Sequence, residues 1–306
     1  MPEWDAEIEV DEALAGSLIR GTYPELDAGS LRLLGVGWDN TVWATGDGIA
    51  FRFPRREIAL AGVRREIAFL PSIAPRLPVP IPDAAYPGAP TEQFPWPWFG
   101  SPIVPGREIA ERTLDDRARE RLADDLGGFL RTLHGLRASD FAALPADLEA
   151  LPVDPMGRTD MTARVPRTHT ALDALDPSGA LSGRAAEILT AALTLAPPNE
   201  LVLTHGDLHV RHTLLDADGR LSGIIDWGDI CRAPAAADLS LYWSLFTRSS
   251  RAIFRAAYGP LKDADLLRAR VLALFLNAIL ASYARGERMP ALEAQALRGV
   301  ERTLAE

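Results

Sequence analysis

The sequence predicts an α+β protein in two parts, a β-rich N-terminal part and a larger, mainly helical C-terminal part. Short apolar runs alternate with turn residues over roughly the first 100 residues, which is typical of short strands. Apolar residues recur at helical spacing over most of the remaining chain. The chain of 306 residues is about twice the length of a typical domain, and we expect parts of 1–101 and 102–306.

In the N-terminal part, a short helix is expected over 11–20, followed by three strands with the sequences LRLLGVGW, NTVWAT and IAFRF. The turn at 46–48 contains Asp-Gly between two apolar runs, which is a strong hairpin signal. Apolar spacing predicts a helix over 56–70 that ends at Pro71. A proline-rich stretch follows, and SPIV at 101–104 is expected to be the last strand.

In the C-terminal part, a long amphipathic helix is predicted over 114–136, and residues 137–165 are expected to be loop-rich. One or two more helices precede an apolar strand at 201–204. A hairpin then turns at 216–219, and the chain is expected to be helical from Asp238 onward.

Composition and charge exclude some classes of function. The chain has 32 basic and 42 acidic residues, a net charge of −10, which argues against general binding to nucleic-acid phosphates. Its single cysteine rules out an intramolecular disulfide and fits a reducing compartment. An acidic N-terminus without an apolar run is no signal peptide, and no apolar stretch is long enough to span a membrane. We therefore expect a cytoplasmic protein.

The segment LVLTHGDLHVRHTLLDADGRLSGIID carries the chemistry. Its first strand leads into His205, Asp207, His209 and His212, and the second strand of its hairpin ends at Asp226. Strand ends are places where a rigid scaffold presents functional groups. Two carboxylates with a nitrogen ligand can hold a divalent cation or transfer a proton.

Three interpretations of this segment compete. The polar residues are ordinary loop residues, or they form a zinc site, or they form a kinase-type phosphotransfer site. His205, His209 and His212 have H-x3-H-x2-H spacing, and three histidines can make the catalytic zinc site of a hydrolase. That spacing converges best on a helix, whereas Gly206 and the run 213–215 favour loop and strand.

HGDLHVRH followed by GIIDW resembles the catalytic signature of the aminoglycoside phosphotransferase superfamily, whose usual form is H-G-D-x-x-x-x-N and then I-D-W. GWDNTVW resembles the nucleotide-binding loop of the superfamily, and FRFPRR resembles its third strand. Asp238 in AADLS resembles its structural aspartate, and the resemblance runs from about Leu31 onward. It implies a bilobal protein-kinase-like fold, with a nucleotide-binding N-lobe and a catalytic, acceptor-binding C-lobe.

The resemblance also implies a role for each site residue. Asp207 would orient the acceptor hydroxyl and take its proton, while Asp226 and His212 would bind Mg²⁺. Arg52 would pair with Glu66 and reach the phosphates of ATP or GTP. The other residues expected to bind nucleotide lie in the loop after the first strand and in the interlobe strand: Trp38, Asp39, Asn40, Ser101 and Ile103.

Two positions depart from the superfamily pattern. His212 stands where the superfamily has asparagine, and Arg52 where it has lysine. The macrolide 2'-phosphotransferases are similar in having that histidine and an R-I-P-R-R strand comparable to 51–56. Magnesium prefers oxygen ligands, so His212 either ligates the metal or donates a hydrogen bond to Asp207 or to a phosphate. A non-catalytic nucleotide-binding protein is an alternative, although Asp207 and Asp226 are both present.

The resemblance and the net charge favour a small, amine-bearing acceptor such as a macrolide or aminoglycoside antibiotic, with a metabolite as an alternative. Neither a nucleic-acid nor a membrane partner is expected. His205 is expected to tie its loop to nearby backbone, whereas His209 either faces the acceptor or packs. Candidates for the acceptor wall are the loop Met156–Arg167 and residues that follow Asp226: Trp227, Asp229, Tyr242, Trp243 and Phe246. For each of the aromatic residues, packing in the helix core is the favoured alternative.

Overall fold

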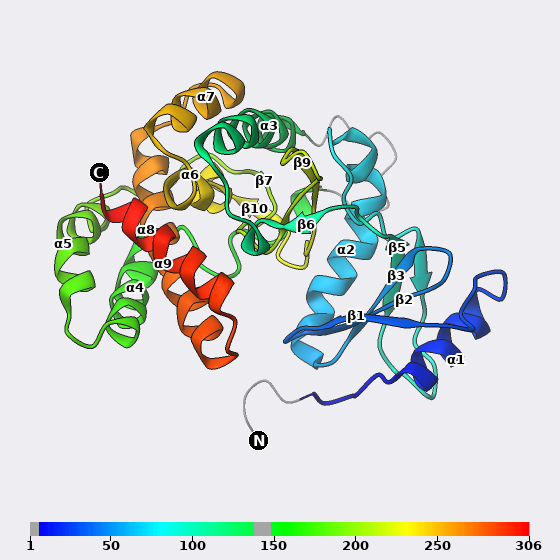
Figure 1. Cartoon of the computed structure of the whole chain (residues 1–306). Helices are drawn as coiled ribbons and strands as arrows, with labels where there is room; N and C mark the ends of the chain where they lie inside the picture. The colour runs from blue at the N-terminus through cyan, green and yellow to red at the C-terminus, as the bar shows by residue number, and fades with distance from the viewer. Residues whose placement is uncertain (1–5, 138–147, 306) are drawn as a thin grey trace.

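The computed structural model describes residues 6–137 and 148–305 and shows the predicted mixture of helix and sheet. Figure 1 shows the N-terminal sheet on one side and the C-terminal helices on the other. Of the loop-rich segment predicted over 137–165, residues 138–147 lie outside the described residues.

The N-terminal part is an antiparallel sheet in the order β1-β2-β3-β5-β4, preceded by α1 (Glu12–Thr22). Its strands are β1 (Arg32–Val36), β2 (Asn40–Ala44), β3 (Ile49–Pro54), β4 (Tyr86–Gly88) and β5 (Trp98–Pro102). The predicted hairpin turn joins β2 to β3, and Gly48 takes the left-handed conformation there, with φ of 81°. The boundary predicted between residues 101 and 102 falls at the end of β5, and the division into 1–101 and 102–306 stays a prediction.

Helix α2 (Leu60–Ile73) follows a short 3₁₀ turn and does not end at Pro71 as the sequence predicts. Pro71 is exposed in the last turn of the helix, and the Ala74 N–H still donates to the Leu70 carbonyl. A proline removes only its own N–H donor, so it can be accommodated where the helix is about to end. The helix therefore continues for two residues beyond Pro71.

The C-terminal part combines two small sheets with a set of helices. One sheet has the order β6-β8-β9, and the other pairs β7 with β10. The strands are β6 (Arg107–Glu108), β7 (Val202–Thr204), β8 (Thr213–Leu215), β9 (Leu221–Ile224) and β10 (Cys231–Ala233). The helices are α3 (Asp116–Gly135), α4 (Met161–Leu175), α5 (Ala180–Leu193), α6 (Ser240–Ser244), α7 (Arg248–Tyr258), α8 (Asp263–Gly286) and α9 (Pro290–Leu304). Short 3₁₀ turns lie at Glu57–Ala59, Ala74–Arg76, Ile109–Glu111, Leu148–Ala150 and Ala235–Asp238.

Each of the two parts has its own packed apolar core. In the N-terminal part, Phe53 stacks on Trp98 at a ring-centroid distance of 5.1 Å beneath α1. In the C-terminal part, one cluster packs α3 and α7 around Phe129 and Trp227, and a second packs α4 and α5 against α8 and α9. Within the described residues, no helix combines the length and apolar character that crossing a bilayer requires.

Helix α2 connects the two parts. The Arg65 Nη2 donates to the Gly228 carbonyl at 2.6 Å, and Gly62 lies against the backbone of Gly228. Further along, the Ile224 N–H donates to the Pro80 carbonyl at 3.3 Å. Contacts of this kind hold α2 directly against the segment that follows β9.

We predict that Gly62→Ala destabilises the protein, although alanine is the better helix former. A Cβ at position 62 would lie 2.9 Å from the Gly228 carbonyl oxygen, so backbone has to move, and such overpacking costs about 1–3 kcal/mol. Gly128→Ala in α3 is the matched control, because a Cβ there meets nothing within 4 Å. It should stabilise by up to about 1 kcal/mol. Thermal or urea unfolding compares the two variants, and a rise in stability for both would contradict the close packing of α2.

Candidate active site

The loop after β7 is fixed by a buried carboxylate. Asp238 has no exposed surface, and it accepts hydrogen bonds from the His205 N–H at 2.8 Å and the Gly206 N–H at 2.9 Å. It also lies 3.1 Å from the His134 Nε2. Gly206 has φ of 85°, and a Cβ there would lie 2.3 Å from the Asp229 carbonyl oxygen. The loop that carries Asp207 is therefore rigid.

His205 has the structural role expected of it. Its Nδ1 accepts the Asp207 N–H at 3.1 Å, and its Nε2 lies 3.0 Å from the Ile225 carbonyl, to which it donates. Burial lowers the pKa of this histidine, so the ring stays neutral. Both ring nitrogens are used within the protein, and His205 cannot serve as a metal ligand in this arrangement. The three-histidine zinc site is thus not formed.

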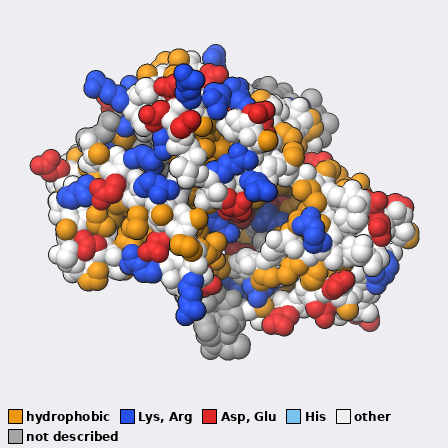
Figure 2. Space-filling model, viewed as in Figure 1, with side chains coloured by type: hydrophobic (Ala, Val, Ile, Leu, Met, Phe, Trp, Pro, Cys, Tyr) orange, Lys and Arg blue, Asp and Glu red, His pale blue; other side chains and the backbone are white. Residues whose placement is uncertain are grey.

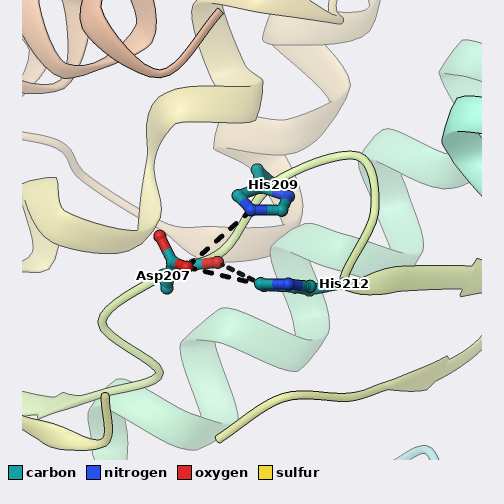
Figure 3. A group of neighbouring side chains, drawn as sticks. All are labelled: Asp207, His209 and His212. Carbon is teal, nitrogen blue, oxygen red and sulfur yellow. Dashed lines mark hydrogen bonds and ion pairs between the residues drawn. The ribbon is translucent and has the colours of Figure 1, made fainter. Parts of the chain in front are cut away.

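Asp207 lies beside His209 and His212 (Figure 3), and its two carboxylate oxygens have different surroundings. Its Oδ1 lies 3.0 Å from the Arg158 Nη2, while its Oδ2 lies 3.8 Å from both the His209 Nε2 and the His212 Nδ1. The His209 Nδ1 accepts the Arg211 N–H at 3.2 Å, so its Nε2 carries the ring proton. Burial, followed by the neighbouring His212, holds the pKa of His209 well below its usual range. A neutral N–H therefore points toward Asp207.

His212 links Asp207 to Asp226. Its Nδ1 lies 2.9 Å from the backbone carbonyl of Asp207, to which it donates, and its Nε2 lies 3.3 Å from the Asp226 Oδ2. A neutral ring in this tautomer turns the Nε2 lone pair toward a carboxylate oxygen. The His212 Nε2 and the Asp226 Oδ2 are then both hydrogen-bond acceptors, and at 3.3 Å they require either a proton or a cation between them. The sequence prediction that these two residues act together is therefore compatible with their placement.

Arg52 on β3 joins both parts of the protein at the site. Its Nη1 lies 2.5 Å from the Glu66 Oε1 on α2, and its Nη2 lies 2.7 Å from the Asp226 Oδ1. Glu66 is buried, and it also accepts the Trp227 N–H at 3.2 Å. Burial raises the pKa of Glu66 to about 7, with Arg52 acting in the opposite direction. Burial works to raise the pKa of Asp226, but the Arg52 guanidinium outweighs it and holds that pKa well below the usual range.

Asp226 itself has φ of 66°, in the left-handed region that residues other than glycine seldom adopt. Aspartate tolerates this conformation better than most residues. Such conformations cluster at functional sites, where the surrounding structure maintains them. Here the surrounding contacts are the Arg52 ion pair and the His212 ring.

The predicted nucleotide loop lies between β1 and β2. Asp39 pairs with Arg56, whose Nε lies 3.1 Å from the Asp39 Oδ1. Trp38 is half exposed, and its ring meets the edge of Tyr283 on α8 at a centroid distance of 5.4 Å. The Asn40 Oδ1 is buried and has no hydrogen-bond partner within residues 6–137 and 148–305. A contact of this loop with nucleotide stays a prediction.

The strand predicted at 101–104 is placed differently in the structure, where β5 ends at Pro102, so Ser101 lies on the strand and Ile103 follows it. Both residues are already engaged within the protein. The Ser101 Oγ accepts the Ala84 N–H at 2.9 Å, and the Ile103 N–H donates to the Gly48 carbonyl at 2.9 Å. Ser101 is buried, and Ile103 is partly exposed. Their predicted contact with a purine therefore cannot use the Ile103 N–H in this conformation.

The aromatic candidates on the acceptor side follow the favoured alternative of the sequence prediction. Trp227, Tyr242 and Phe246 are buried in the core of the C-terminal part, so they do not form an acceptor wall. Asp229 is partly exposed and lies close to Asp207, because both are bonded to Arg158. The sequence pattern does not single out Arg158. It belongs to the segment Met156–Arg167 that the sequence assigns to the acceptor side. Only its first part is a loop, because α4 begins at Met161.

The side chains of the site lie between the two parts of the molecule. Figure 2 shows the surface hollowed there, with acidic and basic side chains in the hollow and hydrophobic side chains around it. Arg52 and Asp226 are supplied from opposite sides, and Asp207 is connected to Asp226 through His212. A carboxylate facing an N–H, a second carboxylate beside an imidazole and a fixed cation suit the transfer of a charged group.

Comparisons of sequence support this chemistry. A model of the phosphotransferase enzyme family matches residues 30–272. The aminoglycoside 3'-phosphotransferase of Streptomyces ribosidificus is 32% identical over 149 residues, 47% of this chain and 52% of its own length. The match thus spans about half of that relative.

Solved structures share the fold over nearly the whole chain. The GDP complex of an aminoglycoside 2'-phosphotransferase covers 97% of this chain and 99% of its own, with a TM-score of 0.70 and 21% identity. The macrolide 2'-phosphotransferase of Brachybacterium faecium covers 94% of this chain and 97% of its own, with a TM-score of 0.59 and 24% identity. The chain therefore belongs to the phosphotransferase enzyme family, and it has the kinase-like fold of the aminoglycoside and macrolide phosphotransferases.

Proposed function

We propose that this enzyme moves the γ-phosphate of GTP or ATP to a hydroxyl group of a small molecule, with Mg²⁺ as cofactor. The observation that carries the proposal is one continuous cluster, in which Asp207 and Asp226 are joined by His212 and Arg52 joins Asp226 to Glu66. Phosphoryl transfer needs an aligned nucleophile and neutralised phosphates more than covalent chemistry from the protein. Two carboxylates joined in this way support the assignment of Asp207 as the base and of Asp226 as the ligand of a cation.

The donor atoms fit a divalent cation. Asp226 is half exposed, its Oδ2 faces the His212 Nε2 at 3.3 Å, and neither atom has a proton of its own when the ring is neutral. We assign these two residues as the protein's metal ligands. Mg²⁺ bound there would offset the negative charge of the nucleotide phosphates. An imidazole ligand suits manganese better than magnesium, so Mn²⁺ is expected to substitute well.

Arg52 would serve the nucleotide. It carries a permanent charge, and its Nη1 and Nη2 are oriented by Glu66 and Asp226. Trp38, Asp39 and Asn40 would cover the phosphates, and the strand with Ser101 and Ile103 would border the purine. Both donors are retained because one structural neighbour was solved with GDP and another, a streptomycin complex, with ATP.

The acceptor hydroxyl would lie between Asp207 and His209. The Asp207 Oδ2 and the His209 Nε2 are 3.8 Å apart, so one oxygen atom can make an ordinary hydrogen bond of about 2.8 Å to each. The hydroxyl would donate to the carboxylate and accept from the neutral imidazole. Among acceptors we favour an amine-bearing antibiotic, a macrolide or an aminoglycoside, because proteins with those names share the fold.

A panel assay tests the proposal. Purified protein with Mg²⁺ and either GTP or ATP is mixed with macrolides, with aminoglycosides and with metabolite alcohols, and the products are examined by mass spectrometry. One added phosphate on a hydroxyl of any compound supports a small-molecule kinase, and the compound identifies the acceptor class. Nucleotide binding without phosphate transfer to any compound, and without release of phosphate to water, would instead favour the non-catalytic alternative.

Asp207→Asn should lower turnover on the order of 100-fold or more, the usual size of a lost acid–base contribution. The amide keeps the size of the side chain and an acceptor for Arg158 but cannot take the hydroxyl proton. Calorimetry should show unchanged nucleotide affinity. Asp218→Asn, at the exposed turn of the β8–β9 hairpin, is the control and should retain wild-type turnover. Near-normal turnover of Asp207→Asn would exclude Asp207 as the base.

The metal assignment predicts different results at its two ligands. Asp226→Asn should weaken Mg²⁺-dependent nucleotide binding, because it removes the charged ligand and the partner of Arg52. His212→Asn should remain active, and its preference for Mn²⁺ over Mg²⁺ should fall, because the replacement offers an oxygen donor. Titration calorimetry with each metal and turnover measurements decide this. An unchanged metal preference in His212→Asn would mean that His212 acts through its own hydrogen bonds.

A further inference from the structure

A buried arginine lies against the candidate base. The Arg158 side chain is 10% exposed, and its Nη2 lies 3.0 Å from the Asp207 Oδ1 and also bonds to the Asp229 Oδ2. Burial works to lower the pKa of Arg158, but Asp207 and Asp229 outweigh it and raise the pKa, so the guanidinium remains charged. One cation therefore bridges two carboxylates at the acceptor side of the site.

The loop that carries Arg158 is built around Asp154. The Asp154 carboxylate accepts the N–H groups of Arg158 and Thr159, both at 2.8 Å, and the Thr159 hydroxyl at 2.6 Å. Asp154 has φ of 37°, and its own N–H donates to the Arg232 carbonyl on β10 at 2.9 Å. β10 pairs with β7, and β7 leads into Asp207. The loop with Arg158 and the loop with Asp207 are therefore both attached to the same small sheet.

A second arginine, Arg164, supports the same loop through hydrogen bonds to its backbone. Arg164 on α4 is buried, and its Nη2 donates to the carbonyls of Met156 at 3.0 Å and Gly157 at 3.2 Å. Its guanidinium carbon lies 4.3 Å from the centre of the Phe275 ring. Burial, followed by repulsion from Arg158, lowers the pKa of Arg164 to about 10. Arg158 and Arg164 are neighbouring cations, and each has its own hydrogen-bond acceptors. These contacts indicate that the surrounding structure fixes the position of Arg158.

The placement of Arg158 determines which oxygen of Asp207 faces the acceptor. The Oδ1 is occupied by the guanidinium, so the carboxylate presents its Oδ2 to the gap beside His209. We propose that Arg158 is a positioning residue for phosphoryl transfer, which holds Asp207 so that its Oδ2 receives the proton of the attacking hydroxyl. The proposal rests on the proposed function.

In the step concerned, the acceptor oxygen forms a bond to the γ-phosphorus while the bond from that phosphorus to the bridging oxygen breaks. The nucleoside diphosphate leaves with that oxygen, and the hydroxyl proton passes to the Asp207 Oδ2. Arg158 keeps all of its protons throughout. Water in place of the hydroxyl gives hydrolysis of the nucleotide by the same route, so the role can be measured without knowing the acceptor.

The test compares Arg158→Gln with Arg268→Gln. Arg268 on α8 is equally buried, donates to the Ala196 carbonyl and pairs with Asp265, so its loss reproduces the cost of removing a buried arginine elsewhere. Hydrolysis of GTP and ATP with Mg²⁺ is measured, together with transfer to macrolides and kanamycin and with nucleotide affinity. Arg158→Gln should lower the rate by on the order of 10- to 100-fold with unchanged nucleotide affinity, since misplacement of a reacting group is that costly. Arg158→Lys should recover part of the loss, and Arg268→Gln should keep its turnover.

A double-mutant cycle separates positioning from a purely structural role. If Arg158 acts through Asp207, Arg158→Gln should cause no further loss of rate in the Asp207→Asn background. Equal losses in both backgrounds, or a rate for Arg158→Gln equal to that of Arg268→Gln, would overturn the proposal. Should Arg158→Gln fail to fold, Thr159→Val, which removes only the hydroxyl bond to Asp154, is measured in its place. It should then lower the rate in the wild-type background alone, and an unchanged rate would count against the proposal.

The same measurements distinguish this failure from failure of the proposed function. An active wild-type enzyme whose Arg158 variants behave like the control removes only the role of Arg158. A wild-type protein that binds nucleotide but neither hydrolyses nor transfers phosphate overturns both proposals together.

Discussion

The Arg52 ion pairs are the interaction on which the rest of the site depends. A single guanidinium binds Glu66 on α2 and Asp226 after β9, so it connects the N-terminal sheet, the helix beside it and the segment that follows β9. Leaving a charge buried without its partner costs several kcal/mol, about 3–5 in typical cases. Glu66 and Asp226 together carry two negative charges, whereas Arg52 carries only one positive charge. Burial can therefore raise the pKa of Glu66 while Asp226 remains ionised. A divalent cation at Asp226 would more than offset this excess negative charge.

Rigid backbone makes the remaining geometry possible. Gly206 and Asp226 both occupy the left-handed region, and each follows a short strand. Asp238 stabilises the turn at Gly206 by accepting hydrogen bonds from two backbone N–H groups. The contacts of Asp226 with Arg52 and His212 hold the turn at Asp226. The side chains that would handle phosphate thus project from turns that are over-determined by their neighbours, as pre-organisation of an active site requires.

Local signals in the sequence predict the fold and much of the site. Asp-Gly in the β2–β3 turn and the strand that ends before His205 depend on neighbouring residues, so spacing and turn chemistry reveal them. Tertiary packing decides the rest. Pro71 is tolerated inside α2 because the helix is nearly finished, and the packing of α6 and α7 decides that Tyr242 and Phe246 lie in the core and not beside the site. Arg158 reaches Asp207 only through a loop whose shape depends on Asp154, and no local sequence pattern predicts such a contact.

Arg158 also changes what the overall charge implies about the acceptor. The net charge of −10 suggests an amine-binding site, yet two carboxylates nearest to the acceptor side, Asp207 and Asp229, are already bridged by a buried guanidinium. A single ammonium group on an acceptor would gain little there, since the local charge of the three groups is only one unit negative. For the amine-bearing acceptor of the proposal, recognition of the amine would therefore have to use other carboxylates. On the proposed function, Asp207 and His209 would bind the acceptor hydroxyl, and acceptor selectivity would be decided farther from the reacting atoms.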